Sequence, residues 1–134
     1  MNQINFGVFG NAAVEAAKMI NMGAEPLEAW ERGVRLFSDK EFMVKKGCPK
    51  TAFLCLCDQG LVRGCPSNPP AISRDNGRYA MEAVQVLRQA PSANLKPIEL
   101  WNRISVGATK KHNSQMNIVL ALHSAGLLQR SNGA

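Results

Sequence analysis

The sequence predicts an all-α protein in which two similar three-helix units pack around a pseudo-twofold axis. One observation is a repeat, since three blocks occur twice in the same order: 13–20 and 80–87, 26–32 and 97–103, and 54–62 and 120–128. A second is the recurrence of apolar residues at three- and four-residue steps, with no stretch that alternates as a strand does. We interpret the repeat as an internal duplication, with copies at about 8–64 and 75–130.

The length bears on the number of domains. A chain of 134 residues usually forms one domain, and a unit of about 60 residues is marginal when it must bury a core alone. We therefore expect residues 1–134 to be a single domain whose two copies share a core.

The first copy is expected to contain three helices: 11–22, one that starts near Pro26, and 48–60. Pro26 suits a first helical turn, where its missing N–H costs nothing. Trp30 lies on an apolar stripe of the second helix, which the core should bury. Gly60 should close the third helix.

The second copy repeats this order, with expected helices at 78–89, 97–104 and 114–124. Gly126 should close its last helix. Trp101 occupies the position of Trp30 in the repeat. Because both lie on apolar stripes, we expect two buried core anchors and not two ligand-stacking residues.

The order of helices in each copy resembles a helix-turn-helix unit, and the Gly-Leu-Val ending at 60–62 resembles that of winged-helix domains. No wing can be read after Val62 or after Gln129. The third helices are apolar throughout at 52–57 and 118–122, so they should be buried against each other and should read DNA bases poorly. Their N-terminal ends would then be the parts available to a ligand.

Three stretches carry a wider resemblance: 45–54, 58–64 and 110–116. They look like the signatures of a family of small bacterial proteins of unknown function. The resemblance implies a bacterial or phage-related cytosolic setting, and it implies no activity, substrate or partner.

Charge is unevenly distributed over the net +6 of the chain. Residues 1–70 carry eight Lys or Arg and seven Asp or Glu, whereas residues 71–134 carry eight and three. The second copy is therefore the basic one. An anionic partner such as nucleic acid or a nucleoprotein would suit it, and a charge that serves only solubility is the alternative.

Cations precede the third helix of both copies, where the helix dipole and the first N–H groups attract anions. The candidate nucleic-acid-binding residues are Lys45, Lys46, Lys50, Lys110, Lys111, His112, Asn113, Gln115, Asn117 and Arg130. The alternative is that these helices are simply capped while the lysines lie in water.

The sequence contains no clear motif for catalysis, metal binding or cofactor binding. Cys48 precedes Pro49 at a helix start among lysines, a setting that favours a thiolate, but no orienting residue accompanies it. The spacing of the four cysteines fits neither a disulfide nor a zinc site. We expect no catalytic residue, no metal and no cofactor.

No apolar run reaches the roughly 20 residues needed to cross a bilayer. We therefore expect a cytoplasmic protein with no membrane partner. Its leading function is a non-catalytic binding module for nucleic acid. A protein–protein adaptor, which could be a homodimer, and a small Cys48 enzyme remain as alternatives.

Overall fold

The computed structural model describes residues 7–58, 60–63, 75–89, 96–104 and 115–128. Within these ranges the chain forms α-helices and no strand, which confirms the all-α prediction. The helices are α1 (Gly7–Asn21), α2 (Pro26–Phe37), α3 (Glu41–Lys45), α4 (Gly47–Asp58), α5 (Asp75–Gln89), α6 (Pro97–Ile104) and α7 (Gln115–Ser124).

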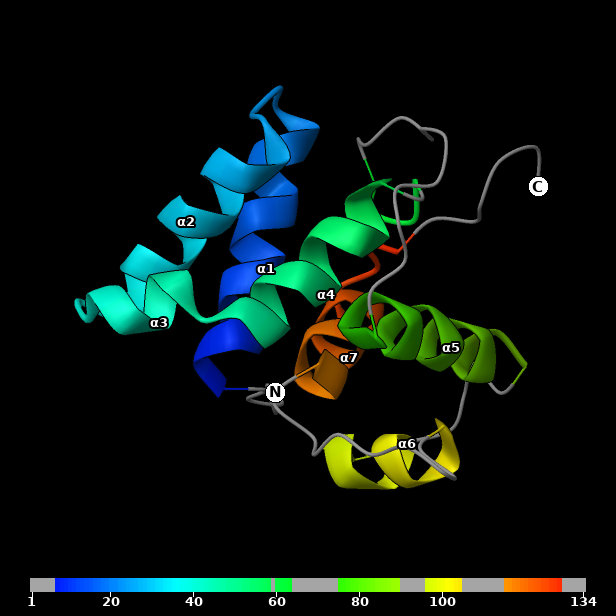
Figure 1. The fold of residues 1–134 in the computed structure, drawn as a ribbon. Coiled ribbons are helices and arrows are strands. Elements are labelled where there is room, and N and C mark those ends of the chain that lie inside the picture. Colours follow the sequence, from blue (N-terminus) through cyan, green and yellow to red (C-terminus); the bar gives the residue numbers. More distant parts are fainter. Residues whose placement is uncertain (1–6, 59, 64–74, 90–95, 105–114, 129–134) are drawn as a thin grey trace, which may run out of the picture.

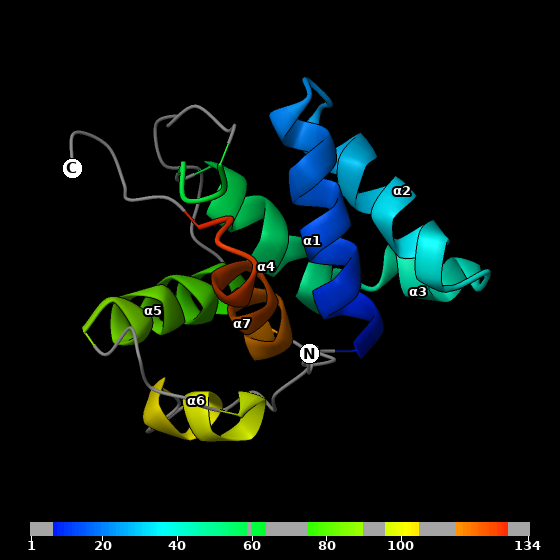
Figure 2. The same ribbon diagram turned by 180° about the vertical axis from the view of Figure 1, so that it is seen from behind.

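Helices α4 and α7 occupy the middle of the molecule, with α1, α2 and α3 on one side and α5 and α6 on the other (Figures 1 and 2). The two central helices contact each other, as the sequence predicts. Each nevertheless packs more extensively against the first helix of the other copy: α7 against α1, and α4 against α5. The two halves of the chain, which the sequence predicts to be copies, therefore interlock and contribute to one core.

The predicted bounds are close for some helices and wrong for others. Helices α2 and α6 begin at Pro26 and Pro97, as expected, whereas α1 begins at Gly7 and not at 11. The sequence also missed α3, so the first copy contains four helices and not three. Five residues that bury only Val44 are too few to show a helical period.

The third helices end in the same way. Gly60 and Gly126 have φ values of 72° and 71°, the left-handed conformation that glycine adopts without a steric cost. The next residue in each case, Leu61 or Leu127, donates its backbone N–H over 2.9 Å to a carbonyl of the last helical turn. This is the Schellman ending that a glycine after a helix predicts.

The segments that follow these endings meet. Val62 and Leu128 form an antiparallel β-bridge, and Arg63 N donates to Leu127 O over 2.9 Å. Val62 and Leu128 are equivalent in the sequence repeat, and an antiparallel pair of equivalent residues is what a twofold axis between them would produce. The duplication and its pseudo-twofold symmetry stay predictions that this pairing supports.

Both tryptophans are buried, as predicted: Trp30 is 0% exposed and Trp101 is 7% exposed. The indole of Trp30 stacks between Phe9 of α1 and Phe53 of α4, with ring centroids 6.2 and 5.1 Å apart. The ring of Trp101 meets Tyr79 edge-on at 5.0 Å. Trp30 therefore joins α2 to α1 and α4, and Trp101 joins α6 to α5.

Helices α1 and α2 approach each other closely at Gly33, where an added Cβ would lie 2.6 Å from the backbone oxygen of Ala12. Because a backbone atom cannot rotate away, we expect Gly33→Ala to lower the free energy of unfolding by about 1–3 kcal/mol. Gly47→Ala is the control, since no heavy atom lies within 4 Å of its Cβ position, and it should change stability by less than about 0.5 kcal/mol. Urea unfolding of both variants measures the difference, and equal midpoints would contradict the close approach.

Candidate phosphate-binding surface

The first turns of α1, α4 and α7 lie near one another in both views (Figures 1 and 2). A Cβ on Gly7, the first residue of α1, would lie 3.8 Å from Asn117 Nδ2 in the first turn of α7. Lys46, just before α4, places Nζ 5.6 Å from the ring centroid of Phe9 in the first turn of α1. We call the surface made by these three helix starts and their lysines the convergent surface.

The first turns of α1, α4 and α7 contain no acidic residue. Helices elsewhere do carry acids at their starts. The Glu25 carboxylate accepts hydrogen bonds from Leu27 N and Glu28 N at the start of α2, and Glu99 accepts one from Lys96 N at the start of α6. A carboxylate at a helix start offsets the positive end of the helix dipole. At the convergent surface no acid of the first turns supplies that offset.

Lysines provide full positive charges at the same place. Lys45 is exposed at the end of α3, and Lys50 is half-buried in the first turn of α4. Lys46 is half-buried over the face of Phe9, where its ammonium group is attracted by the aromatic ring. Three of the predicted residues therefore lie beside the convergent helix starts.

The other predicted residues divide into three groups. Gln115 is 0% exposed, so it belongs to the core and is not part of a binding surface. Asn117 is half-buried beside Gly7. Lys110, Lys111, His112, Asn113 and Arg130 lie outside the described residues.

Sequence reasoning missed the contribution of α1. Residues 7–10 lack the glycine spacing and the lysine of a nucleotide-binding loop, so their sequence does not indicate an anion site. The structure shows that they form the first turn of α1, next to α7 and Lys46. A helix start without acids was a local signal, but its proximity to two other helix starts depends on tertiary packing.

Residues 6–129 match a protein family of unknown function, DUF6979. The chain belongs to this family. The family resemblance noted in the sequence is thereby confirmed, and its unknown function brings no activity to the chain. No curated protein and no solved structure is significantly similar to the chain.

Two cysteines of this DUF6979 protein can be described, and neither has the setting of a reactive thiolate. Cys57 is buried and Cys55 is half-buried. Burial raises the pKa of the Cys55 thiol, and the nearby charge of Asp58 raises it further. The side chain of Cys48 lies outside the described part of the chain.

Metal ligands do not gather among the residues that the structure describes: no three His, Cys, Asp or Glu side chains are placed to hold an ion. None of the described helices combines the length and the apolar character needed to cross a membrane.

Proposed function

We propose that this DUF6979 protein is a non-catalytic module that binds nucleic acid by its phosphates at the convergent surface. The observation that carries the proposal is the meeting of three acid-free helix starts beside Lys45, Lys46 and Lys50. Each helix start contributes about half a positive charge. Phosphate groups are ligands that such ends commonly hold.

The proposal includes the basic segment of the second copy. Lys110 and Lys111 precede α7 closely in the chain, as Lys45 and Lys46 precede α4. We propose that their positive charge also contributes to phosphate binding. A cytoplasmic location, which the sequence predicts, would bring such a surface within reach of nucleic acid.

Sequence-independent binding follows from the burial of the third helices. A helix that reads the major groove presents polar side chains along an exposed face. Helix α7 is buried from Gln115 to Leu122 except at half-buried Asn117, and the side chains of Ala52, Phe53, Leu56 and Cys57 in α4 are buried. The proposed contacts are therefore made to phosphates, which carry no base information.

The test is the salt dependence of binding to a short DNA duplex. We expect the affinity to fall steeply between about 50 and about 200 mM salt, with a logarithmic slope of about 0.9 for each phosphate neutralised. The double variant Lys45→Gln/Lys46→Gln should reduce that slope by up to about two. Lys110→Gln/Lys111→Gln should have a similar effect. Electrophoretic shifts at several salt concentrations measure the slopes.

Lys18→Gln provides the matched control. Lys18 is exposed in the last turn of α1, away from the helix starts, and it pairs with Glu15 at 3.2 Å. Its loss should leave the slope unchanged. If the unmodified protein binds no nucleic acid even at low salt, the proposal is wrong and the adaptor alternative replaces it.

A further inference from the structure

Exposed apolar side chains gather where α2 ends and α3 begins. Leu36, Phe37 and Phe42 are 61%, 42% and 65% exposed. We call these three side chains the corner patch. Large apolar side chains grouped on a surface commonly mark a binding site, because water solvates them poorly.

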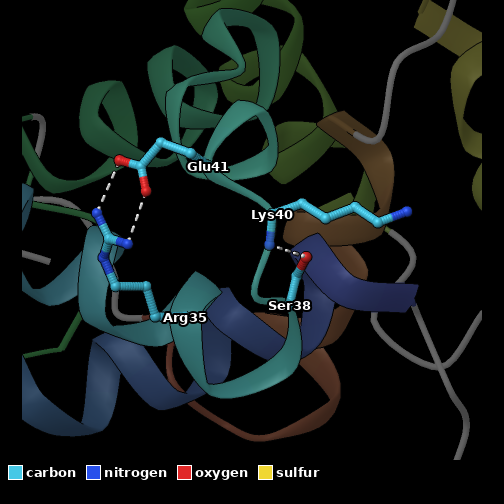
Figure 3. Close-up of polar contacts among 4 residues, drawn as sticks. All are labelled: Arg35, Ser38, Lys40 and Glu41. Atoms are coloured by element: carbon cyan, nitrogen blue, oxygen red, sulfur yellow. Dashed lines mark hydrogen bonds and ion pairs between the residues drawn. The ribbon is translucent and has the colours of Figure 1, made fainter.

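The corner that carries the patch is held by polar contacts (Figure 3). Arg35 donates two hydrogen bonds to the Glu41 carboxylate, at 2.8 and 2.9 Å, and Lys40 N donates to Ser38 Oγ over 3.2 Å. The hydrogen bond from Arg35 lowers the pKa of Glu41, so the pair persists until the pH falls through that lowered pKa. The aromatic rings are therefore presented on a defined turn.

Lysines lie close to Phe42, in space or along α3. Lys40 Nζ lies 6.0 Å from the ring centroid of Phe42, and Lys45 follows Phe42 by three residues, which places both on one face of α3. Residues 35–50 carry five Lys or Arg and two Asp or Glu, and the pairing of Arg35 with Glu41 leaves four lysines and Asp39. Along the chain, lysines continue from the corner patch to Lys46 at the convergent surface.

This combination of positive charge and exposed rings is complementary to a nucleic acid whose bases are unpaired. In proteins that bind single strands, aromatic rings stack on unpaired bases, and nearby cations bind the phosphates of the backbone. Inside a duplex the base faces are covered by their neighbours, so the rings would find no partner there. We propose that the preferred ligand of this protein is a single-stranded nucleic acid, with bases stacked on Phe42 and Phe37 and phosphates held by Lys45 and Lys46. This inference rests on the proposed function and specifies its substrate class.

The test compares an oligothymidine of about 20 nucleotides, an abasic strand with the same number of phosphates, and a duplex of the same length. We expect the oligothymidine to bind more tightly than either of the other two. Phe42→Ala should weaken oligothymidine binding at least about five-fold and leave abasic-strand binding unchanged, because only the former supplies rings to stack on. Phe42→Trp should restore the affinity. Fluorescence anisotropy with end-labelled strands measures all of these values.

Ile98→Ala is the matched control, since Ile98 is 53% exposed on α6 and far along the chain from the corner patch. It should change none of the affinities, and circular dichroism should show that every variant is folded. If all three ligands bind equally and Phe42→Ala changes none of them, the phosphate site stands and the stacking proposal is overturned. If no strand binds, both fail. If sedimentation instead shows a dimer that Phe42→Ala dissociates, the corner patch serves self-association and the stacking proposal is overturned.

Discussion

Trp30→Ala is expected to lower the free energy of unfolding by about 3–5 kcal/mol. The indole is 0% exposed and lies between the rings of Phe9 and Phe53, so its removal leaves a cavity where α1, α2 and α4 meet. Domains of this size are commonly stable by only about 5–15 kcal/mol. The variant should therefore be barely folded or unfolded, as urea unfolding followed by circular dichroism will show.

Two further variants sharpen this result. Nε1 of Trp30 is a buried donor without an acceptor in the described part of the chain, so Trp30→Phe keeps a stacked ring and removes an unsatisfied group. It should cost clearly less than Trp30→Ala. Met22→Ala should change stability by less than about 0.5 kcal/mol, because Met22 is 89% exposed. An unchanged melting temperature for Trp30→Ala would show that the aromatic stack does not support the core.

Separating the two copies is expected to abolish cooperative folding. A fragment of residues 1–70 lacks α7, the partner of α1, and α5, the partner of α4. A fragment of residues 71–134 lacks α1, the partner of α7, and α4, the partner of α5. Each fragment would expose the apolar faces that these pairs bury. A unit of about 60 residues buries too little apolar surface to tolerate that loss.

Thermal unfolding of the isolated fragments, followed by circular dichroism, tests this expectation. Neither fragment should show a cooperative transition, and mixing the two should increase the helical signal because the interlocked pairs can form again. A cooperative transition in either fragment alone would mean that the copies are independent domains.

Three lysines of the candidate site could be predicted from the sequence. Lys45, Lys46 and Lys50 were identified because cations before a helix start are a local pattern, and the structure places them beside the convergent helix starts. Gln115 followed the same pattern, yet it is fully buried. A polar residue in the first turn of a helix can face the solvent or the core, and only the packing of α7 against its neighbours decides which.

The exposure of the corner patch could not be predicted from the sequence, for a related reason. In the sequence, Phe37 continues the apolar stripe of α2 and would be expected to be buried with Trp30. In the structure α2 ends at Phe37, which is 42% exposed, and the chain turns at Ser38 into α3. The end of the helix, and not its periodicity, determines whether that side chain reaches the core.

The sequence by itself determined that the protein is helical and where several helices begin or end. Pro26 and Pro97 start helices and Gly60 and Gly126 close them, because these residues act on the backbone within one or two turns. Only the tertiary structure decided that α1 packs on α7 and α4 on α5. All four helices bury apolar side chains in one core, and composition alone does not select which helices pair. The choice depends on how the shapes of the faces fit together and on how the chain connects the helices.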